Sequence, residues 1–180
     1  SLGVDIRVYG GDWQSFDSVV MASHSDQSLN LLEDPSTDEV RLLSAIKYQP
    51  NQAILHSDPV VMPKRKRCWS SWVYASDQAD SANPVGVSYW MNRLQSIPES
   101  ENFFQSLNPT REIKQELIHD QNMFMHPVFD RAALAAQQEI KGIQGHNNTW
   151  FCGAWLRNGF HEDGYSSAVD ILENMGVMAG

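Results

Sequence analysis

The architecture of this 180-residue chain is set by the segment Phe151-Cys152-Gly153-Ala154-Trp155-Leu156-Arg157-Asn158-Gly159-Phe160-His161-Glu162-Asp163-Gly164 near its end. Its pattern predicts a short apolar strand, a loop with glycines, and an amphipathic helix from Glu162 to Met175. Because the helix begins at the loop, its unpaired backbone N–H groups and positive dipole end face whatever the loop holds. The segment is typical of one wall of a site for a phosphate or a polarised ring carbonyl.

The complementary half of a nucleotide site is not found in this sequence. No Gly-x-Gly-x-x-Gly motif follows a strand anywhere in the 180 residues. That motif normally holds the pyrophosphate of a dinucleotide at the start of a helix. The chain therefore carries half of a cofactor site without its partner half.

Composition narrows the class of protein. Apolar residues make up 42% and aromatic residues 10%, as in a folded globular domain. The net charge of −9 argues against nucleic acid or an anionic membrane as the main partner. No apolar run approaches the roughly 20 residues of a transmembrane helix, and no signal peptide opens the chain. With only two cysteines, the expectation is a cytoplasmic protein without disulfides.

The first fifty residues predict a hairpin followed by helices. Residues 4–9 and 16–22 read as two strands joined at Gly10-Gly11, and the unbroken apolar run 19–21 predicts burial on both faces. Ser36-Thr37-Asp38-Glu39 has the form of a capping box, with Ser36 as the N-cap of a helix.

The middle of the chain predicts an antiparallel sheet. Strand patterns occur at residues 53–56, 67–74, 85–91 and 103–104, separated by polar breaks that contain prolines. A helix capped by Asp130 and a last strand at 149–153 follow. We therefore expect an α+β fold, a mostly antiparallel mixed sheet flanked by helices, with the C-terminal strand and helix packed alongside.

Several motifs together resemble one protein family. The C-terminal pattern Phe-Cys-Gly-Ala, then His-Glu-Asp-Gly-x-x-Ser-Ala, is similar to the flavin-contacting motif of the FAD-dependent amine oxidase and desaturase superfamily. The remainder resembles a bacterial branch of predicted NAD/FAD-binding amine oxidase-like proteins. The matching segments are 16–27, 48–58, Met62-Pro63, Trp69-Ser70-Ser71-Trp72, 89–95, Leu107-Asn108-Pro109 and 126–130.

The resemblance implies a division by role, a cofactor, a reaction and a missing partner. Residues 1–145 would form the substrate segment, and residues 146–180 the C-terminal cofactor-contacting segment. FAD would accept hydride from a substrate C–N or C–C bond, while the protein positions and tunes it. The glycine-rich fingerprint of the family lies on an N-terminal FAD-binding domain that this sequence does not contain, so the isolated chain is expected to be inactive and to bind flavin weakly. The residues that the resemblance places at the cofactor are Gly153, Ala154, Trp155, Gly159, Phe160, His161, Glu162, Asp163, Gly164 and Ser167.

The substrate is expected to be a small apolar, amine or lipid-like molecule. Trp72, Tyr89 and Trp90 occupy two predicted strands and could line an apolar cavity, although core packing explains many such aromatic residues. Ser166-Ser167 stands where familiar amine oxidases carry an acidic residue with glycine, and no active-site lysine can be placed. Desaturation or another lipid-directed oxidation is therefore as consistent with the sequence as amine chemistry, and the catalytic residues stay unassigned.

Other features have plainer readings. For Glu162 and Asp163 the alternative to contact with the flavin ribityl chain is ordinary helix capping. The six histidines show no metal-binding spacing, so no metal is expected. Lys64-Arg65-Lys66-Arg67 is either a solvated turn or an anchor for an anionic head group or phosphate. The alternative function for the whole chain is a non-catalytic domain that binds an apolar ligand or another protein.

Overall fold

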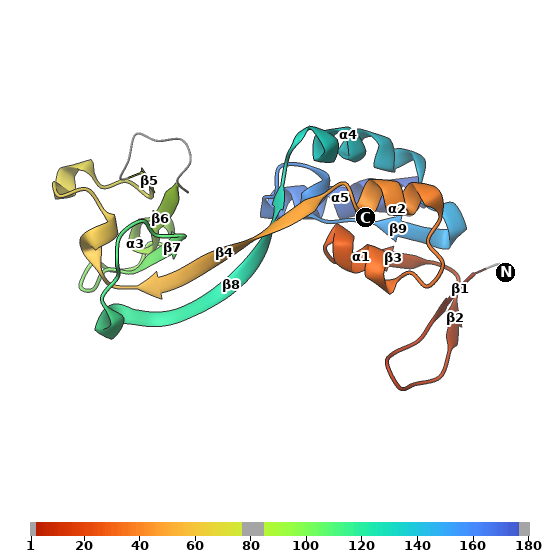
Figure 1. The fold of residues 1–180 in the computed structure, drawn as a ribbon, viewed down its shortest axis with the longest axis horizontal. Coiled ribbons are helices and arrows are strands. Elements are labelled where there is room, and N and C mark those ends of the chain that lie inside the picture. The colour runs from red at the N-terminus through yellow and green to blue at the C-terminus, as the bar shows by residue number, and fades with distance from the viewer. Residues whose placement is uncertain (1–2, 77–84, 177–180) are drawn as a thin grey trace. The chain divides into compact units, whose positions relative to one another are not determined.

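The computed structural model describes residues 3–76 and 85–176, which form two compact units (Figure 1). Unit 1 comprises residues 1–48 and 127–180, and unit 2 comprises residues 49–126. The chain leaves unit 1 after Tyr48 and returns to it at Pro127. These units follow packing, not the role-based segments 1–145 and 146–180, and that functional division stays a prediction. The polar break between the predicted strands 67–74 and 85–91 lies at 77–84, outside the described residues.

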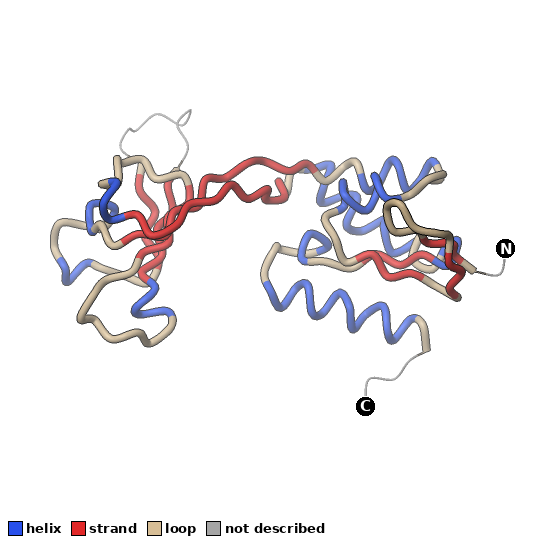
Figure 2. Tube along the Cα trace, turned by 90° about the horizontal axis from the view of Figure 1, so that it is seen from below, coloured by secondary structure: helices blue, strands red, loops and turns tan. Residues whose placement is uncertain are grey.

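Unit 2 is built on a five-stranded sheet with the order β5-β6-β7-β4-β8 (Figure 2). Its elements are β4 (Lys47–His56), β5 (Trp72–Ala75), β6 (Gly86–Trp90), α3 (Met91–Leu94), β7 (Phe104–Leu107) and β8 (Ile118–Val128). The pairs β5–β6, β6–β7 and β4–β7 are antiparallel. The α+β fold with a mostly antiparallel sheet is confirmed.

One face of this sheet carries the core of unit 2. Ile54, Phe104 and Trp90 pack there with the segment after β4 and with Ile113. Because side chains alternate across a strand, the neighbouring residues Tyr89, Val87 and Trp72 lie on the opposite face. The sheet thus has one buried face and one partly exposed, aromatic face.

Unit 1 is mostly helical. Its helices are α1 (Ser25–Leu31), α2 (Thr37–Leu43), α4 (Arg131–Glu139) and α5 (His161–Asn174), and its strands are β1 (Val4–Ile6), β2 (Gln14–Phe16), β3 (Val19–Met21) and β9 (Thr149–Phe151). The predicted capping box of α2 is present: Ser36 Oγ accepts from Glu39 N–H, and the Glu39 carboxylate accepts from Ser36 N–H.

The core of unit 1 joins segments that are distant in sequence. Its buried members come from α2, α4 and β9 and from the loop after β9. They are Leu42, Leu43, Ile46, Ala133, Ala136, Ile140, Ile143, Phe151 and Trp155. The apolar stripes of α2 and α4 therefore cover Phe151, the residue that begins the cofactor-like segment.

The N-terminal hairpin differs from the prediction in its second strand. β1 pairs in antiparallel fashion with β2, Gln14–Phe16, and Gly10 adopts a positive φ of 77° in the connection. The run Val19–Met21 is a separate strand that pairs in parallel with β9. Val20 is 46% exposed, so the prediction of burial on both faces is wrong. β9 lies beside β3 within the sheet, and the described residues leave the face of Val20 uncovered.

Sequence patterns also missed one strand and made another too long. β8 was not predicted, because its apolar and polar residues do not alternate with period two, and most of them are exposed. Its Pro127 is compatible with a strand at the edge of a sheet. The predicted strand at 67–74 begins only at Trp72, after the 3-10 turn η2 (Lys66–Cys68). Among the described residues no helix has the length and apolar character needed to cross a membrane.

A buried histidine links three strands of unit 2. His56 is fully buried, its Nδ1 accepts from Asp58 N–H, and its Nε2 is 2.9 Å from Ser106 Oγ. Since Nδ1 is an acceptor, the ring is neutral and Nε2–H donates to Ser106. Ser106 shares a second hydrogen bond with Ser88. Burial lowers the pKa of His56 more than the Asp58 carboxylate raises it.

Replacing the central aromatic residue of unit 2 tests whether that unit has a core of its own. Phe104→Ala removes a fully buried ring and is expected to cost about 3–5 kcal/mol of stability. Hydrogen exchange followed by mass spectrometry should show lost protection in 49–126 and retained protection in unit 1. The control Phe124→Ala removes a ring that is 52% exposed and should change little. Equal loss of protection in both units would contradict independent cores.

The buried histidine predicts a pH dependence of stability. Its folded pKa lies below the ordinary value of 6.5, so the unfolded chain binds more protons as the pH falls below that value. The free energy of unfolding should therefore decline below about pH 6.5, and the decline should be shallower in His56→Gln. Denaturation curves over a pH series measure this slope. His146→Gln, an exposed histidine in unit 1, should keep the wild-type slope.

Candidate functional site

The candidate site is the loop that joins β9 to α5. It contains a short 3-10 turn, η6 (Ala154–Leu156), after Gly153. Gly153 has a φ of +149°, and a Cβ there would lie 2.6 Å from the Trp155 indole nitrogen. Glycine is therefore needed both for the backbone conformation and for the close approach of the indole.

Ser167 fixes the start of α5 against this loop. Its buried hydroxyl accepts from Gly153 N–H at 2.9 Å and donates to the Gly164 carbonyl at 2.7 Å. One side chain thus satisfies a backbone group on each side of the loop. Ser167 therefore holds the loop against the start of α5 as a clamp.

Asp163 lies in the first turn of α5 and caps that helix. Its carboxylate accepts from Phe160 N–H at 2.9 Å and from Asn158 N–H at 3.2 Å. The capping interpretation therefore holds for this residue in the structure. Glu162, its neighbour, is exposed, and no hydrogen bond to its carboxylate occurs within the described residues.

Two glutamines that the sequence analysis did not single out hold the loop from the side of α4. The buried amide of Gln137 donates to the carbonyls of Trp155 and Arg157 at 2.8 and 2.7 Å. Gln144 pairs with both the N–H and the carbonyl of Phe151. The sequence signal for this role was Gln137, a polar residue on the apolar stripe of the predicted helix.

The predicted cofactor residues fall into two groups. Trp155 is buried in the core of unit 1, with its indole N–H donating to the Ser23 carbonyl, and Ser167 is likewise buried. Gly153, Ala154, Asp163 and Gly164 are half-buried and shape the loop. The exposed members are Gly159, Phe160, His161 and Glu162.

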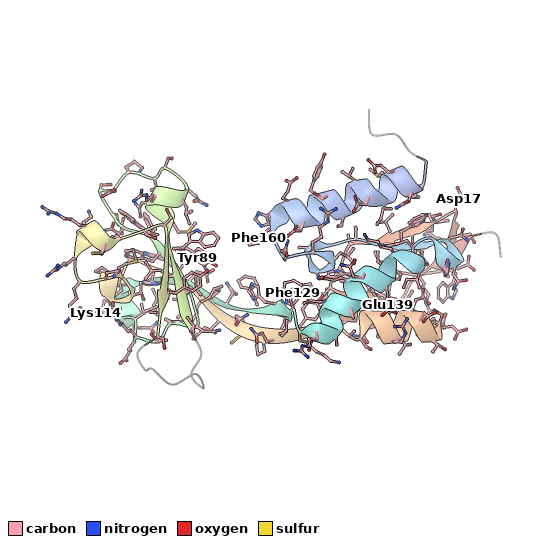
Figure 3. The ribbon with its side chains drawn as sticks, turned by 90° about the horizontal axis from the view of Figure 1, so that it is seen from above. Asp17, Tyr89, Lys114, Phe129, Glu139 and Phe160 are labelled. Atoms are coloured by element: carbon pink, nitrogen blue, oxygen red, sulfur yellow. The ribbon has the colours of Figure 1, made fainter. Side chains whose placement is uncertain are left out.

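The exposed group presents donors at the start of a 14-residue helix. Within residues 3–76 and 85–176, the backbone N–H groups of His161 and Glu162 make no hydrogen bond. Figure 3 shows Phe160 where α5 begins, and the Phe129 ring would lie 3.3 Å from a Cβ on Gly159. The arrangement offers two N–H donors and a positive dipole end beside apolar rings, which suits an electron-rich, planar ligand edge.

A cleft of about 760 Å³ lies in unit 1 beside the loop. It is bordered by α4 and the turn after it on one side and by α5 on the other, with Trp150 of β9 among its lining residues. Its polar lining includes Gln137, Lys141, Gln144, Asp170 and Glu173. A volume of this size is ample for a ligand or for a segment of polypeptide.

The three aromatic residues predicted for the substrate do not share one surface. Trp72 and Tyr89 are cross-strand partners with ring centroids 5.5 Å apart on the exposed face of the sheet. Trp90 is 6% exposed and packs edge-on against Trp69 in the core on the other face. A surface formed by the sheet can include Trp72 and Tyr89, and Trp90 supports it from behind.

The described residues at the site favour neither a reactive cysteine nor a bound metal ion. Burial raises the pKa of the Cys152 thiol, which disfavours the reactive thiolate. In the described part of the chain, no three His, Cys, Asp or Glu side chains gather as a metal site would require.

Comparison with known proteins gives a fold relationship. No protein-family model and no curated protein matches the chain. The solved structures that it resembles include a CLA-producing fatty acid isomerase from P. acnes and a protein from Exiguobacterium sp. 255-15 designated a protoporphyrinogen oxidase. The first has a TM-score of 0.57 at 14% identity, over 90% of this chain and 42% of that one. The second has a TM-score of 0.59 at 10% identity, over 95% and 43%.

The likeness establishes the fold. This chain spans less than half the length of either solved protein. At these identities the activities of the two proteins do not transfer by resemblance alone.

The serine clamp predicts a specific loss of stability. Ser167→Ala leaves the part-buried Gly153 N–H without its acceptor and should cost about 1–3 kcal/mol in chemical denaturation. Ser166→Ala is the matched control, since the Ser166 side chain makes no hydrogen bond among the described residues, and it should stay within about 0.5 kcal/mol of wild type. If the two variants were equally stable, the clamp would not be holding the loop.

Proposed function

We propose that this chain supplies part of the flavin site and part of the substrate-binding surface of an FAD-dependent oxidoreductase. The observation that carries the proposal is the start of α5. There, the backbone N–H groups of His161 and Glu162 make no hydrogen bond within the described residues. The loop before them is held by hydrogen bonds of the side chains of Asp163, Ser167 and Gln137. Such preorganised donors suit the polar edge of a flavin, where they would stabilise negative charge on the reduced ring.

The residues fit the cofactor in distinct ways. The N–H groups of His161 and Glu162 would face the flavin, while Asp163 is occupied in capping. Glu162 is then the carboxylate that remains to accept from ribityl hydroxyls. Arg157 is paired with Asp170 at 2.8 Å and so is not proposed as a phosphate ligand. When bound, FAD supplies the chemistry by accepting a hydride from the substrate.

The remaining phosphate contacts would come from a glycine-rich FAD-binding part of the protein outside these 180 residues. Two features of unit 1 support a partner of this kind. The parallel pair β3–β9 is a two-stranded fragment of a sheet type that is normally larger and covered on both faces. The cleft beside α5 has room for a segment of polypeptide.

We propose an apolar, lipid-like substrate for the full protein. Trp72 is 45% and Tyr74 66% exposed on a sheet face that also carries Val87 and Tyr89. A surface of this composition can bury an alkyl chain. The fatty acid isomerase among the structural neighbours favours a lipid over a small amine.

Flavin binding by the complete protein is the direct test. Purified from its whole gene, the protein should show the two visible absorption bands of oxidised flavin, whereas the 180-residue chain alone should be colourless. Glu162→Gln should weaken FAD binding about tenfold, since it removes a charge-assisted acceptor. Glu33→Gln, at an exposed position of unit 1 that does not line the cleft, should leave the affinity unchanged.

The outcome separates the two candidate functions. A complete protein that purifies colourless and takes up no added FAD would refute the oxidoreductase proposal. If the 180-residue chain then bound fatty acids on the Trp72–Tyr89 face without flavin, the non-catalytic ligand-binding alternative would replace it.

A further inference from the structure

Charge is distributed unequally between the two units. Unit 1 contains six Lys or Arg and fourteen Asp or Glu, a formal charge of −8, whereas unit 2 contains seven and eight, a charge of −1. Four of the seven cations of unit 2 are the consecutive residues Lys64, Arg65, Lys66 and Arg67, which we call the basic turn. The acidity of the whole chain therefore does not describe the surface around this turn.

The basic turn is held in place from within unit 2. Arg65 is the N-cap of the 3-10 turn η2, and all four cationic side chains are exposed. Trp69 Nε1–H donates to the Pro63 carbonyl at 2.8 Å and so closes the loop around them. Lys66 Nζ lies 5.7 Å from the centre of the Trp69 ring. The cations are thus presented by a folded turn anchored to the core of the unit.

Acidic groups neutralise only part of this charge. Glu99 pairs with Lys66 at 3.0 Å. Asp58 is buried, and its carboxylate accepts from the backbone N–H groups of Val60 and Lys114. Lys64, Arg65 and Arg67 form no ion pair within the described residues. Lys114 is also exposed, and in Figure 3 it lies at the end of unit 2 where the nitrogen-tipped side chains of the yellow segment project.

The geometry suits an extended anionic surface better than a single bound anion. The N–H groups of Cys68 and Trp69 are already bonded to the carbonyls of Arg65 and Lys66. These two N–H groups are therefore not free to bind a phosphate, and none of the four cations lines the cleft beside α5 or the small pocket that includes Val61 and Arg111. Val60, exposed on the neighbouring turn η1 (Pro59–Val61), adds an apolar side chain of the kind that enters a lipid headgroup layer.

We propose that the basic turn binds the headgroup layer of an anionic bilayer. Each Lys or Arg near such a surface strengthens binding about fivefold, so three unpaired cations give a weak, reversible and salt-sensitive attachment. This attachment requires neither flavin nor catalysis. It would hold unit 2, whose sheet has an exposed aromatic face, at the membrane, in which apolar molecules dissolve.

Vesicle sedimentation of the 180-residue chain tests the proposal. The chain should bind vesicles of phosphatidylcholine mixed with phosphatidylglycerol and should not bind vesicles of phosphatidylcholine alone. Raising the salt from about 0.1 M to about 1 M shortens the screening length from about 10 to about 3 Å and should release it. The triple variant Lys64→Gln, Arg65→Gln, Arg67→Gln should bind about a hundredfold more weakly.

Two further variants separate the turn from general effects of charge and folding. A second triple variant combines Lys47→Gln, Arg131→Gln and Lys141→Gln, and so makes the same change of net charge at exposed residues of unit 1. It should bind the vesicles as wild type does. Glu99→Gln frees Lys66 and should bind about fivefold more tightly, a gain that misfolding would not produce.

Several results would overturn the proposal. They are equal loss of binding in both triple variants, equal binding to the two kinds of vesicle, or release of the chain by millimolar inorganic phosphate at constant ionic strength. Tighter binding to duplex DNA than to anionic vesicles would assign the turn to nucleic acid instead. None of these results depends on FAD, so they leave the proposed oxidoreductase function untouched.

Discussion

The parallel pairing of β3 with β9 is the constraint on which unit 1 depends. Val19 pairs with Thr149 across 130 positions of sequence, and all of unit 2 is contained within that interval. Closing so long a loop costs conformational entropy that only tertiary contacts can offset. The offset comes from the helices α2 and α4, whose apolar stripes pack around Phe151 of β9. Unit 2 can therefore be regarded as an insertion between two halves of one packed core.

The same pairing positions the candidate site. Once β9 is held by β3 and by the side chain of Gln144, the chain must turn at Gly153, and Ser167 and Gln137 fix the turn. The buried backbone groups of the loop are satisfied by these side chains, as a rigid site requires. The N–H groups of His161 and Glu162 make no hydrogen bond within the described residues, because residues in the first turn of a helix have no intrahelical carbonyl to accept from them. The proposed ligand-binding start of α5 thus follows from the packing of a strand.

Unit 2 contributes through the two faces of its sheet. Phe104, Trp90 and His56 fill one face, so Tyr89 and Trp72 must lie on the other. The basic turn belongs to the segment that covers the buried face and is held by the same aromatic cluster, through Trp69. Packing in a single core thereby fixes both an apolar surface and a cationic one. That combination is the physical basis of our proposal that unit 2 contacts a lipid-like molecule.

The sequence by itself determined those elements whose signals lie in a few neighbouring residues. The capping box at Ser36, the Asp130 cap and the strand–glycine–helix order at 151–164 could each be read directly, since capping and glycine conformations depend on neighbouring residues. Strand partnership depends on distant segments, so Val19–Met21 was assigned to a hairpin, and β8 was not recognised. Tertiary structure alone decided that Trp90 faces the core and that Gln137 holds the loop. Alternation and spacing in the sequence indicate which side chains share a face of a helix or strand. Only the neighbours that pack against the element decide which face is buried and which polar group is left without a hydrogen bond.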